Sequence, residues 1–194
     1  SSFAVLIGDI LQGNYLKNVQ LPKGENEFMG SILPLADNLL VIMKIGFRSA
    51  HFIVLDLSNM QQIHLGYING RMPQEVELAL THNGFVAMHG HCHSTLEIWR
   101  ISRARCEKVT QNKENIREER IYAMAALPEG QIVTGGFGLI FYKVEDTGKL
   151  VREKALPSGN VIDEIVPLGD QRLLTVDRYA WCSGIVKLWE YFQD

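Results

Sequence analysis

The 194-residue sequence is poor in cysteine, with only Cys92, Cys106 and Cys182 and no Cys-x-x-Cys pair. A disulfide framework needs cysteines in pairs, and the common structural zinc sites need closely spaced ones, so we expect neither. A few scattered thiols are typical of a reducing compartment, and we predict a cytoplasmic protein.

Long apolar runs and an excess of one charge are also absent. No run reaches eighteen apolar residues, so no membrane span is expected. The formal net charge of -3 predicts no general attraction to nucleic acid or to an anionic membrane.

The chain starts SSFAVLIGDI, which has no basic leader, no evident signal-peptide cleavage site and no initiator Met. We therefore expect it to be a piece of a longer chain.

Signatures of common catalytic sites are missing as well. There is no Gly-x-Ser-x-Gly or His-Glu-x-x-His motif, and Asp9, Asp163, Glu164 and Asp177 form no spaced carboxylate pair. The TGGFG segment at 134–138 lacks the Lys-Ser/Thr that grips phosphate, so we interpret it as a tight turn between strands. These absences predict a protein that is not an enzyme and holds no cofactor.

What the sequence does have is a repeat of about 45 residues. Short β-rich runs end in Leu or an aromatic residue; they are FIVLDL at Leu55, LEIWRI at Trp99, LIFYKV at Tyr142 and IVKLWEY at Trp189. The anchors are separated by 44, 43 and 47 residues, which suits a propeller blade of four strands.

Each unit has the same internal order of strands and turns. A first strand ends in turn residues (SILPLADN, ELALTHNG, AMAALPEG, EIVPLGDQ), a second strand and a variable loop follow, and a fourth strand closes three of the units. The pattern predicts an all-β fold with blades near 28–75, 76–120, 121–160 and 161–194. We interpret NKENIREER, between two units, as a solvated connector with one helical turn and not as a nucleic-acid patch.

The unit at 131–156 resembles the WD-repeat β-propeller family. It has a second strand, a Gly-rich loop, a third strand ending in an aromatic residue, and a Thr-Gly-Lys hairpin at 147–149. The units with Trp99 and Trp189 are similar, and the resemblance covers about 28–192. Arg100 and Glu190 stand where the family has Asp after the Trp, and the Gly-His pair before the first strand is absent. The resemblance is therefore to a divergent member, which keeps the Trp of the family's buried His–Asp–Trp network but lacks its Asp and the Gly-His pair.

The N-terminal segment 3–21 is expected to form two closing strands. Tyr15–Leu21 would complete the last blade, which is the ring closure that WD-repeat propellers commonly use, and Phe3–Ile10 would be an extra strand. Closed rings of four blades are uncommon, whereas an open arc leaves apolar edges exposed. Two alternatives stay open: a compact ring, or part of a larger ring that another copy or another polypeptide completes.

The loops between second and third strands share a face with the connectors between blades. Aromatic and Arg side chains are enriched in interface hot spots, and these loops contain several. We predict that this face binds a protein or peptide partner through Phe47, Arg48, Arg71, His91, His93, Arg178, Tyr179 and Trp181. Aromatic residues on strands, such as Trp99, Tyr142 and Trp189, are expected to pack in the core.

The segment MHGHCHS suggests a different function. Alternate residues of an extended chain share a face, so His89, His91 and His93 would point the same way, as three imidazole ligands of zinc or copper do. The equivalent loops of the other units repeat no such ligand set, so a ring of metal sites is excluded, and an ordinary loop of turn-compatible residues is the simpler interpretation of the cluster. The alternatives to a scaffold are thus a metal-binding protein or enzyme at this cluster, and a structural subunit of a larger propeller complex.

Overall fold

The computed structural model describes residues 2–9, 14–22, 27–46, 50–68, 76–90, 96–111, 120–179 and 183–191. These residues form five antiparallel sheets in which consecutive strands are neighbours. Three sheets have four strands, one has three and one is a two-stranded hairpin. The predicted all-β propeller of four-stranded blades is confirmed.

The four larger sheets are the blades. The first consists of β3 (Phe28–Leu35), β4 (Leu39–Ile45), β5 (Ala50–Asp56) and β6 (Gln61–Ile68), and the second of β7 (Val76–Leu80), β8 (Phe85–Gly90), β9 (Leu96–Ile101) and β10 (Cys106–Gln111). The third consists of β11 (Ala123–Ala126), β12 (Gln131–Gly135), β13 (Gly138–Val144) and β14 (Leu150–Pro157), and the fourth of β15 (Val161–Gly169), β16 (Arg172–Tyr179) and β17 (Ser183–Glu190). Within the described ranges the one helical element is the 3-10 turn Pro128–Gly130, and no helix there is long and apolar enough to span a membrane.

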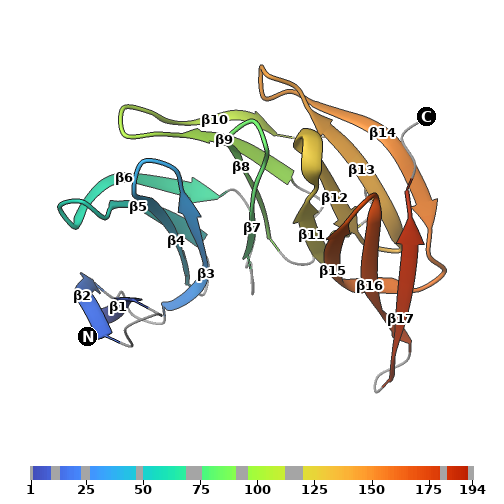
Figure 1. Ribbon diagram of the computed structural model, residues 1–194, viewed down its shortest axis with the longest axis horizontal. Helices are drawn as coiled ribbons and strands as arrows, with labels where there is room; N and C mark the ends of the chain where they lie inside the picture. Colours follow the sequence, from blue (N-terminus) through green and yellow to red (C-terminus); the bar gives the residue numbers. More distant parts are fainter. Residues whose placement is uncertain are drawn as a thin grey trace.

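The blades follow one another along an arc (Figure 1). Their first strands are neighbours in space, since β3 contacts β7, β7 contacts β11, and β11 contacts β15. The hairpin of β1 (Ser2–Asp9) and β2 (Asn14–Pro22) lies at one end of the arc, and β17 lies at the other. First strands are therefore central and later strands peripheral, as a propeller requires.

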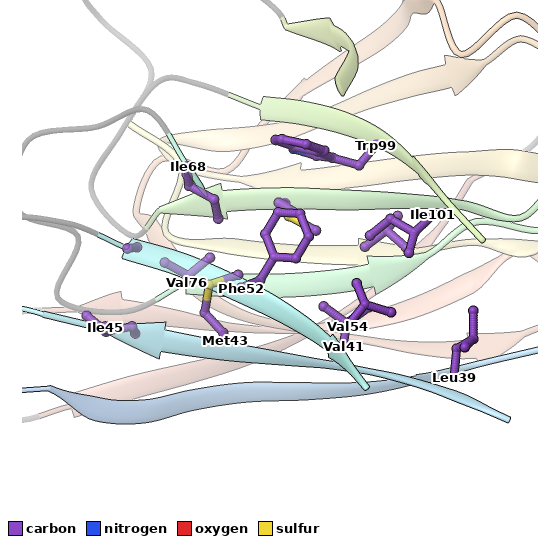
Figure 2. Packing of buried hydrophobic residues seen from close by; sticks show 13 residues of the cluster. Leu39, Val41, Met43, Ile45, Phe52, Val54, Ile68, Val76, Trp99 and Ile101 are labelled. Atoms are coloured by element: carbon purple, nitrogen blue, oxygen red, sulfur yellow. The ribbon is translucent and has the colours of Figure 1, made fainter. Parts of the chain in front are cut away.

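Apolar side chains fill the space between successive blades. Because side chains alternate along a strand, each central blade buries one face against the blade before it and the other against the blade after it. Between the first and second blades, the rings of Phe52 and Trp99 meet edge to face with centroids 4.9 Å apart (Figure 2). The third-strand aromatics Trp99 and Tyr142 are buried, as predicted for core residues.

Turn chemistry explains where several strands end. Asp37 and Asn38 both have positive φ, 58° and 59°, which is the conformation of the tight hairpin turn that Asp and Asn tolerate best. The predicted Thr-Gly-Lys hairpin joins β13 to β14, with Gly148 at φ 84° and its N–H donating to Glu145 O at 2.7 Å.

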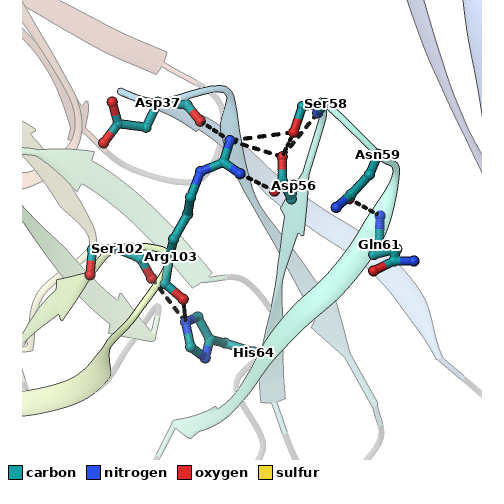
Figure 3. A network of polar contacts seen from close by, with 8 residues as sticks. All are labelled: Asp37, Asp56, Ser58, Asn59, Gln61, His64, Ser102 and Arg103. Atoms are coloured by element: carbon teal, nitrogen blue, oxygen red, sulfur yellow. Dashed lines mark hydrogen bonds and ion pairs between the residues drawn. The ribbon is translucent and has the colours of Figure 1, made fainter.

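A polar clasp also joins the first and second blades on the side opposite the loops between second and third strands. The Arg103 guanidinium, in the turn between β9 and β10, binds both carboxylate oxygens of Asp56 and donates to Asp37 O at 2.8 Å (Figure 3). His64 Nε2 lies 2.9 Å from Ser102 O in the same turn. The clasp ties neighbouring blades together at a distance from their apolar core.

The N-terminal strands do not close the ring. β2 pairs with β1 along its length, from Ser2 opposite Pro22 to Asp9 opposite Asn14, and β17 remains at the edge of its sheet. The expectation that Tyr15–Leu21 completes the last blade is therefore not met. A local hairpin closes a short loop, whereas pairing with β17 would join segments at opposite ends of the chain at a larger entropic cost.

Candidate partner-binding face

The loop face is the side of the arc where second strands end and third strands begin. Among the described residues it consists of the ends of β4, β8, β12 and β16, the segments 120–122 and 136–138, and the connector 158–160. The sequence predicted partner binding on this side.

Most of the predicted binding residues lie outside the described residues. These are Phe47, Arg48, Arg71, His91, His93 and Trp181. Tyr179 ends β16, and its backbone alone is described. For these residues partner binding stays a prediction, and Arg178 is the one member of the set whose side chain can be placed.

A pocket of about 220 Å³ opens at the loop-face end of the third blade. Its lining is mostly apolar, with Arg120 and Thr134 as polar members; it comprises Arg120, Ile121, Thr134–Ile140, Tyr142 and Ala155–Pro157. The ring of Phe137 lines it and is 58% exposed. A cavity of this size is smaller than typical drug-sized sites and suits a single side chain of a larger partner.

The pocket depends on a glycine-rich turn. A Cβ on Gly136 would lie 2.5 Å from Arg120 O, and one on Gly138 would lie 2.5 Å from Leu156 O. The Gly136 carbonyl accepts from Ile162 N at 2.8 Å, which joins the turn to the fourth blade. Two residues separate β12 from β13, so the interpretation of TGGFG as a tight turn is confirmed.

Arg178 is held in a fixed position at the loop-face end of the fourth blade. Its Nε and one terminal nitrogen donate to the two carboxylate oxygens of Asp163 at 2.7 and 2.8 Å. The guanidinium carbon lies 5.9 Å from the ring centroid of Tyr122, two residues after the pocket residue Arg120. The side chain is half exposed, so a planar, oriented cation is presented to solvent.

A buried polar network fixes the adjacent connector. Trp189 Nε1 donates to Thr175 Oγ1 at 2.9 Å, and that hydroxyl donates to Asp177 Oδ1 at 2.6 Å. Ser158 Oγ, in the connector between β14 and β15, donates to Asp177 Oδ2, and Lys187 Nζ lies 2.6 Å from the same oxygen. The indole of Trp189 therefore reaches a carboxylate through the Thr175 hydroxyl. That carboxylate belongs to Asp177 on β16 and not to the residue after the Trp.

The electrostatics of Asp177 follow from these contacts. Burial alone would raise the pKa of its carboxyl group, but the hydrogen bonds from Lys187, Ser158 and Thr175 and the Lys187 charge outweigh it. The net effect holds the pKa of Asp177 below its usual value.

A second polar group lies at the loop-face end of the first blade. Lys44 Nζ is 3.1 Å from Glu27 Oε2, and both side chains are largely buried. His51 Nε2 lies 3.9 Å from Glu27 Oε1, and the rings of His51 and Tyr67 have centroids 5.9 Å apart. Burial is the main cause that lowers the pKa of His51. The sequence analysis missed this group because its members pair only once the strand register is known.

The histidine cluster is described at one position. His89 is fully buried, its Nε2 lies 3.2 Å from Glu77 Oε2, and its Nδ1 has no hydrogen-bond partner in the described part of the chain. His91 and His93 lie outside the described residues. No three His, Cys, Asp or Glu side chains among the described residues are arranged to hold a metal ion. A metal site at His89, His91 and His93 stays a prediction.

Sequence reasoning also missed the pocket and the Asp163 and Tyr122 partners of Arg178. Asp163 lies at the register shift between Ile162 and Glu164, so the alternation of side chains along the strand does not show that it meets Arg178. In the sequence, the signal that could have indicated the pocket is the aromatic residue Phe137 within a glycine-rich turn.

Comparison with known proteins gives a fold but no family. No protein-family model matches the chain, and no curated protein matches its sequence significantly. Among solved structures, it is similar to the β-propeller domain of Cps50 (Swd1) from Myceliophteria thermophila, with a TM-score of 0.71 and 11% identity. That match covers 99% of this chain, which spans 64% of that domain. It is also similar to the computationally designed protein Ika4, with a TM-score of 0.60, 16% identity and coverage of 87% and 94% of the two chains.

Proposed function

We propose that this protein is a non-catalytic interaction scaffold, a divergent WD-repeat propeller that binds a peptide or protein partner on its loop face. The observation that carries the proposal is the apolar pocket at the end of the third blade, lined by an exposed Phe137. Exposed aromatic rings beside a small apolar cavity are characteristic of binding surfaces, because a partner side chain that fills the cavity is removed from water on all sides.

The surroundings of the pocket favour a polypeptide over a small metabolite. The cavity accommodates one side chain, so the remaining contacts must come from the surface around it. Arg178 is oriented by Asp163 and Tyr122 and half exposed, so little further ordering is needed when a partner carbonyl approaches the solvent-facing part of its guanidinium group. The partner in this proposal inserts an apolar side chain beside Phe137 and places an acceptor near Arg178.

The proposal is tested with peptides selected from a phage-displayed random library against the wild-type protein. Phe137→Ala should weaken the selected peptides at least about tenfold, because it removes an aromatic hot-spot contact. Arg178→Ala combined with Trp181→Ala tests the remainder of the predicted face in the same assay. The matched control is Leu65→Ala, an exposed apolar residue of β6 that is remote from the pocket in the chain.

The Phe137 and Arg178 variants should keep the wild-type unfolding temperature within a few degrees, since the Phe137 side chain is mostly exposed and the Arg178 side chain is half exposed. Selection of peptides whose affinity is lowered by Leu65→Ala but not by Phe137→Ala would show that the binding surface lies elsewhere. Failure to select any peptide whose binding depends on the loop face would contradict the proposal.

A further inference from the structure

The pocket at the loop-face end of the third blade has Arg120 as the charged residue of its described lining. Most of the other lining residues are apolar or glycine, and the hydroxyl-bearing Thr134 and Tyr142 are buried. Arg120 is exposed, and no carboxylate of the described residues forms an ion pair with its guanidinium group. An exposed cation therefore forms part of the wall of an apolar cavity.

The cations of the adjacent fourth blade are already bound to carboxylates. Arg178 donates to the two oxygens of Asp163 at 2.7 and 2.8 Å, and Lys187 Nζ lies 2.6 Å from Asp177 Oδ2. In the described part of the chain, the charge of Arg120 has no such partner. An anion that binds at the pocket can therefore pair with Arg120 without breaking an existing ion pair.

The described acidic residues of the third blade do not stand at the pocket end of its sheet. Glu145 and Asp146 are in the hairpin between β13 and β14, whereas the pocket is at the opposite end, where Gly138 pairs with Pro157. Glu153 accepts from Gln131 Nε2 at 2.7 Å, at the start of β12. The pocket end of the blade is thus positive in its described residues, although the whole chain has a net charge of -3.

We propose that the partner carries a carboxylate next to the apolar side chain that enters the pocket, so that the ligand is an acidic peptide with an apolar anchor. This inference rests on the loop-face binding proposed above and specifies its partner. The anchor fills the cavity beside Phe137, and the carboxylate pairs with Arg120. An Asp or Glu side chain and a C-terminal carboxylate present the same group, and both are sources of the acid in this proposal.

The apolar contact and the ion pair reinforce each other. A guanidinium–carboxylate pair on an open surface contributes little, because water and salt screen it. When the anchor fills the cavity, the pair beside it is partly removed from water, and charges attract more strongly in a medium of lower dielectric constant. Arginine also binds a carboxylate through two parallel hydrogen bonds, which fixes the direction of the peptide. The pair therefore supplies the specificity that a small apolar cavity lacks by itself.

The inference is tested with peptides selected from a phage-displayed random library against the wild-type protein at low ionic strength. Among the peptides whose binding needs Phe137, an apolar residue next to Asp, Glu or the C-terminus should recur. Replacing the acid by Asn or Gln, or amidating the C-terminus, should weaken the synthetic peptide at least about fivefold, because a charge-assisted contact is lost. The replacement that has this effect identifies the source of the carboxylate.

Charge reversal at Arg120 tests the residue itself. Arg120→Glu should weaken the acidic peptide at least about tenfold, and a peptide with Lys in place of the acid should recover part of the lost binding. Arg105→Glu is the matched control, since it makes the same change in net charge at an exposed position in the turn between β9 and β10, opposite the loop face. It should change both affinities less than about twofold, because salt screens a distant charge. Circular dichroism checks the fold of both variants, and Arg120→Gln gives the same comparison if the reversal unfolds the chain.

The outcomes separate this inference from the function on which it rests. Peptides that need Phe137 but bind equally well to the wild type and to Arg120→Glu would overturn the acidic partner and leave the scaffold proposal standing. Equal effects of Arg120→Glu and Arg105→Glu would also overturn it, since the attraction would then come from net charge and not from the pocket. A selection in which no peptide depends on Phe137 would overturn both proposals.

Discussion

Asp177 shows how a single residue can organise a buried polar network in the fourth blade. No Asp follows Trp189, yet Trp189 still reaches an acid through Thr175, because Asp177 stands two residues further along β16 on the same face. The carboxylate accepts from a hydroxyl on each side and from Lys187, so its hydrogen-bonding capacity is well used although it is fully buried. A buried carboxylate with this many donors stabilises the folded state only while it is ionised.

Asp177→Asn should therefore lower stability in a pH-dependent way. The pKa of Asp177 is lower in the folded chain than in the unfolded one, so its contribution is present above the unfolded value near 4 and is lost as the pH falls through the folded value. At pH 7 the variant should lose about 1–3 kcal/mol, because Lys187 and the hydroxyls lose a charged acceptor. Urea unfolding from pH 7 to pH 3 should show a smaller decrease for the variant than for the wild type. Asp170→Asn, at an exposed turn, is the control, and equal pH profiles for wild type and Asp177→Asn would contradict this account.

At the scale of elements, the turn between β9 and β10 acts as a clasp on the neighbouring blade. Arg103 and Asp56 are 47 residues apart in sequence and meet because the two blades are adjacent. Asp56 is almost fully buried, and its pKa is lowered first by hydrogen bonds from Ser58 and then by Arg103. Removing the cation leaves the carboxylate with fewer partners in a site that water reaches poorly.

Arg103→Ala should consequently destabilise the protein more than Arg100→Ala. Arg100 pairs with Glu107 at 3.2 Å on the same blade, with both side chains exposed, and such pairs contribute only about 0–1 kcal/mol. Arg103→Lys should recover little, since an ammonium group cannot bind both Asp56 oxygens and the Asp37 carbonyl in the geometry of a guanidinium fork. Urea denaturation midpoints of the three variants measure the difference. Similar midpoints for Arg103→Ala and Arg100→Ala would show that the clasp contributes no more than a surface pair.

The sequence predicted elements well where a local signal marks them. Turn residues such as Asp37, Asn38 and Gly148 mark the ends of strands, and the spacing of Trp99, Tyr142 and Trp189 marks the third strands. Contacts between blades, such as Arg103 with Asp56, have no signal in the chain, because they depend on the twist and register of two sheets. The partner of β2 was missed for the same reason, since a strand pattern does not say which edge the strand joins.

At the scale of the whole molecule, the repeat could be predicted from the sequence, but whether its blades form a closed ring or an arc could not. A period near 45 residues indicates blades, whereas the curvature that decides between a ring and an arc comes from the packing of whole sheets on one another. The candidate site shows the same limit. The sequence indicated the loop that contains Phe137, but the pocket beside Phe137 forms only where β12, β13 and β14 meet the segment at Arg120.

The stacking of blades predicts an uneven stability along the arc. In an array whose units contact mainly their neighbours, a central unit loses two interfaces when it opens and a terminal unit loses one. The second and third blades are covered on both faces, and the fourth on one. Backbone amides of β8, β9, β12 and β13 should therefore exchange with deuterium at least about tenfold more slowly than those of β16. Uniform exchange across all four blades would mean that the arc opens as one unit, and that its end is held by something other than the contacts described between neighbouring blades.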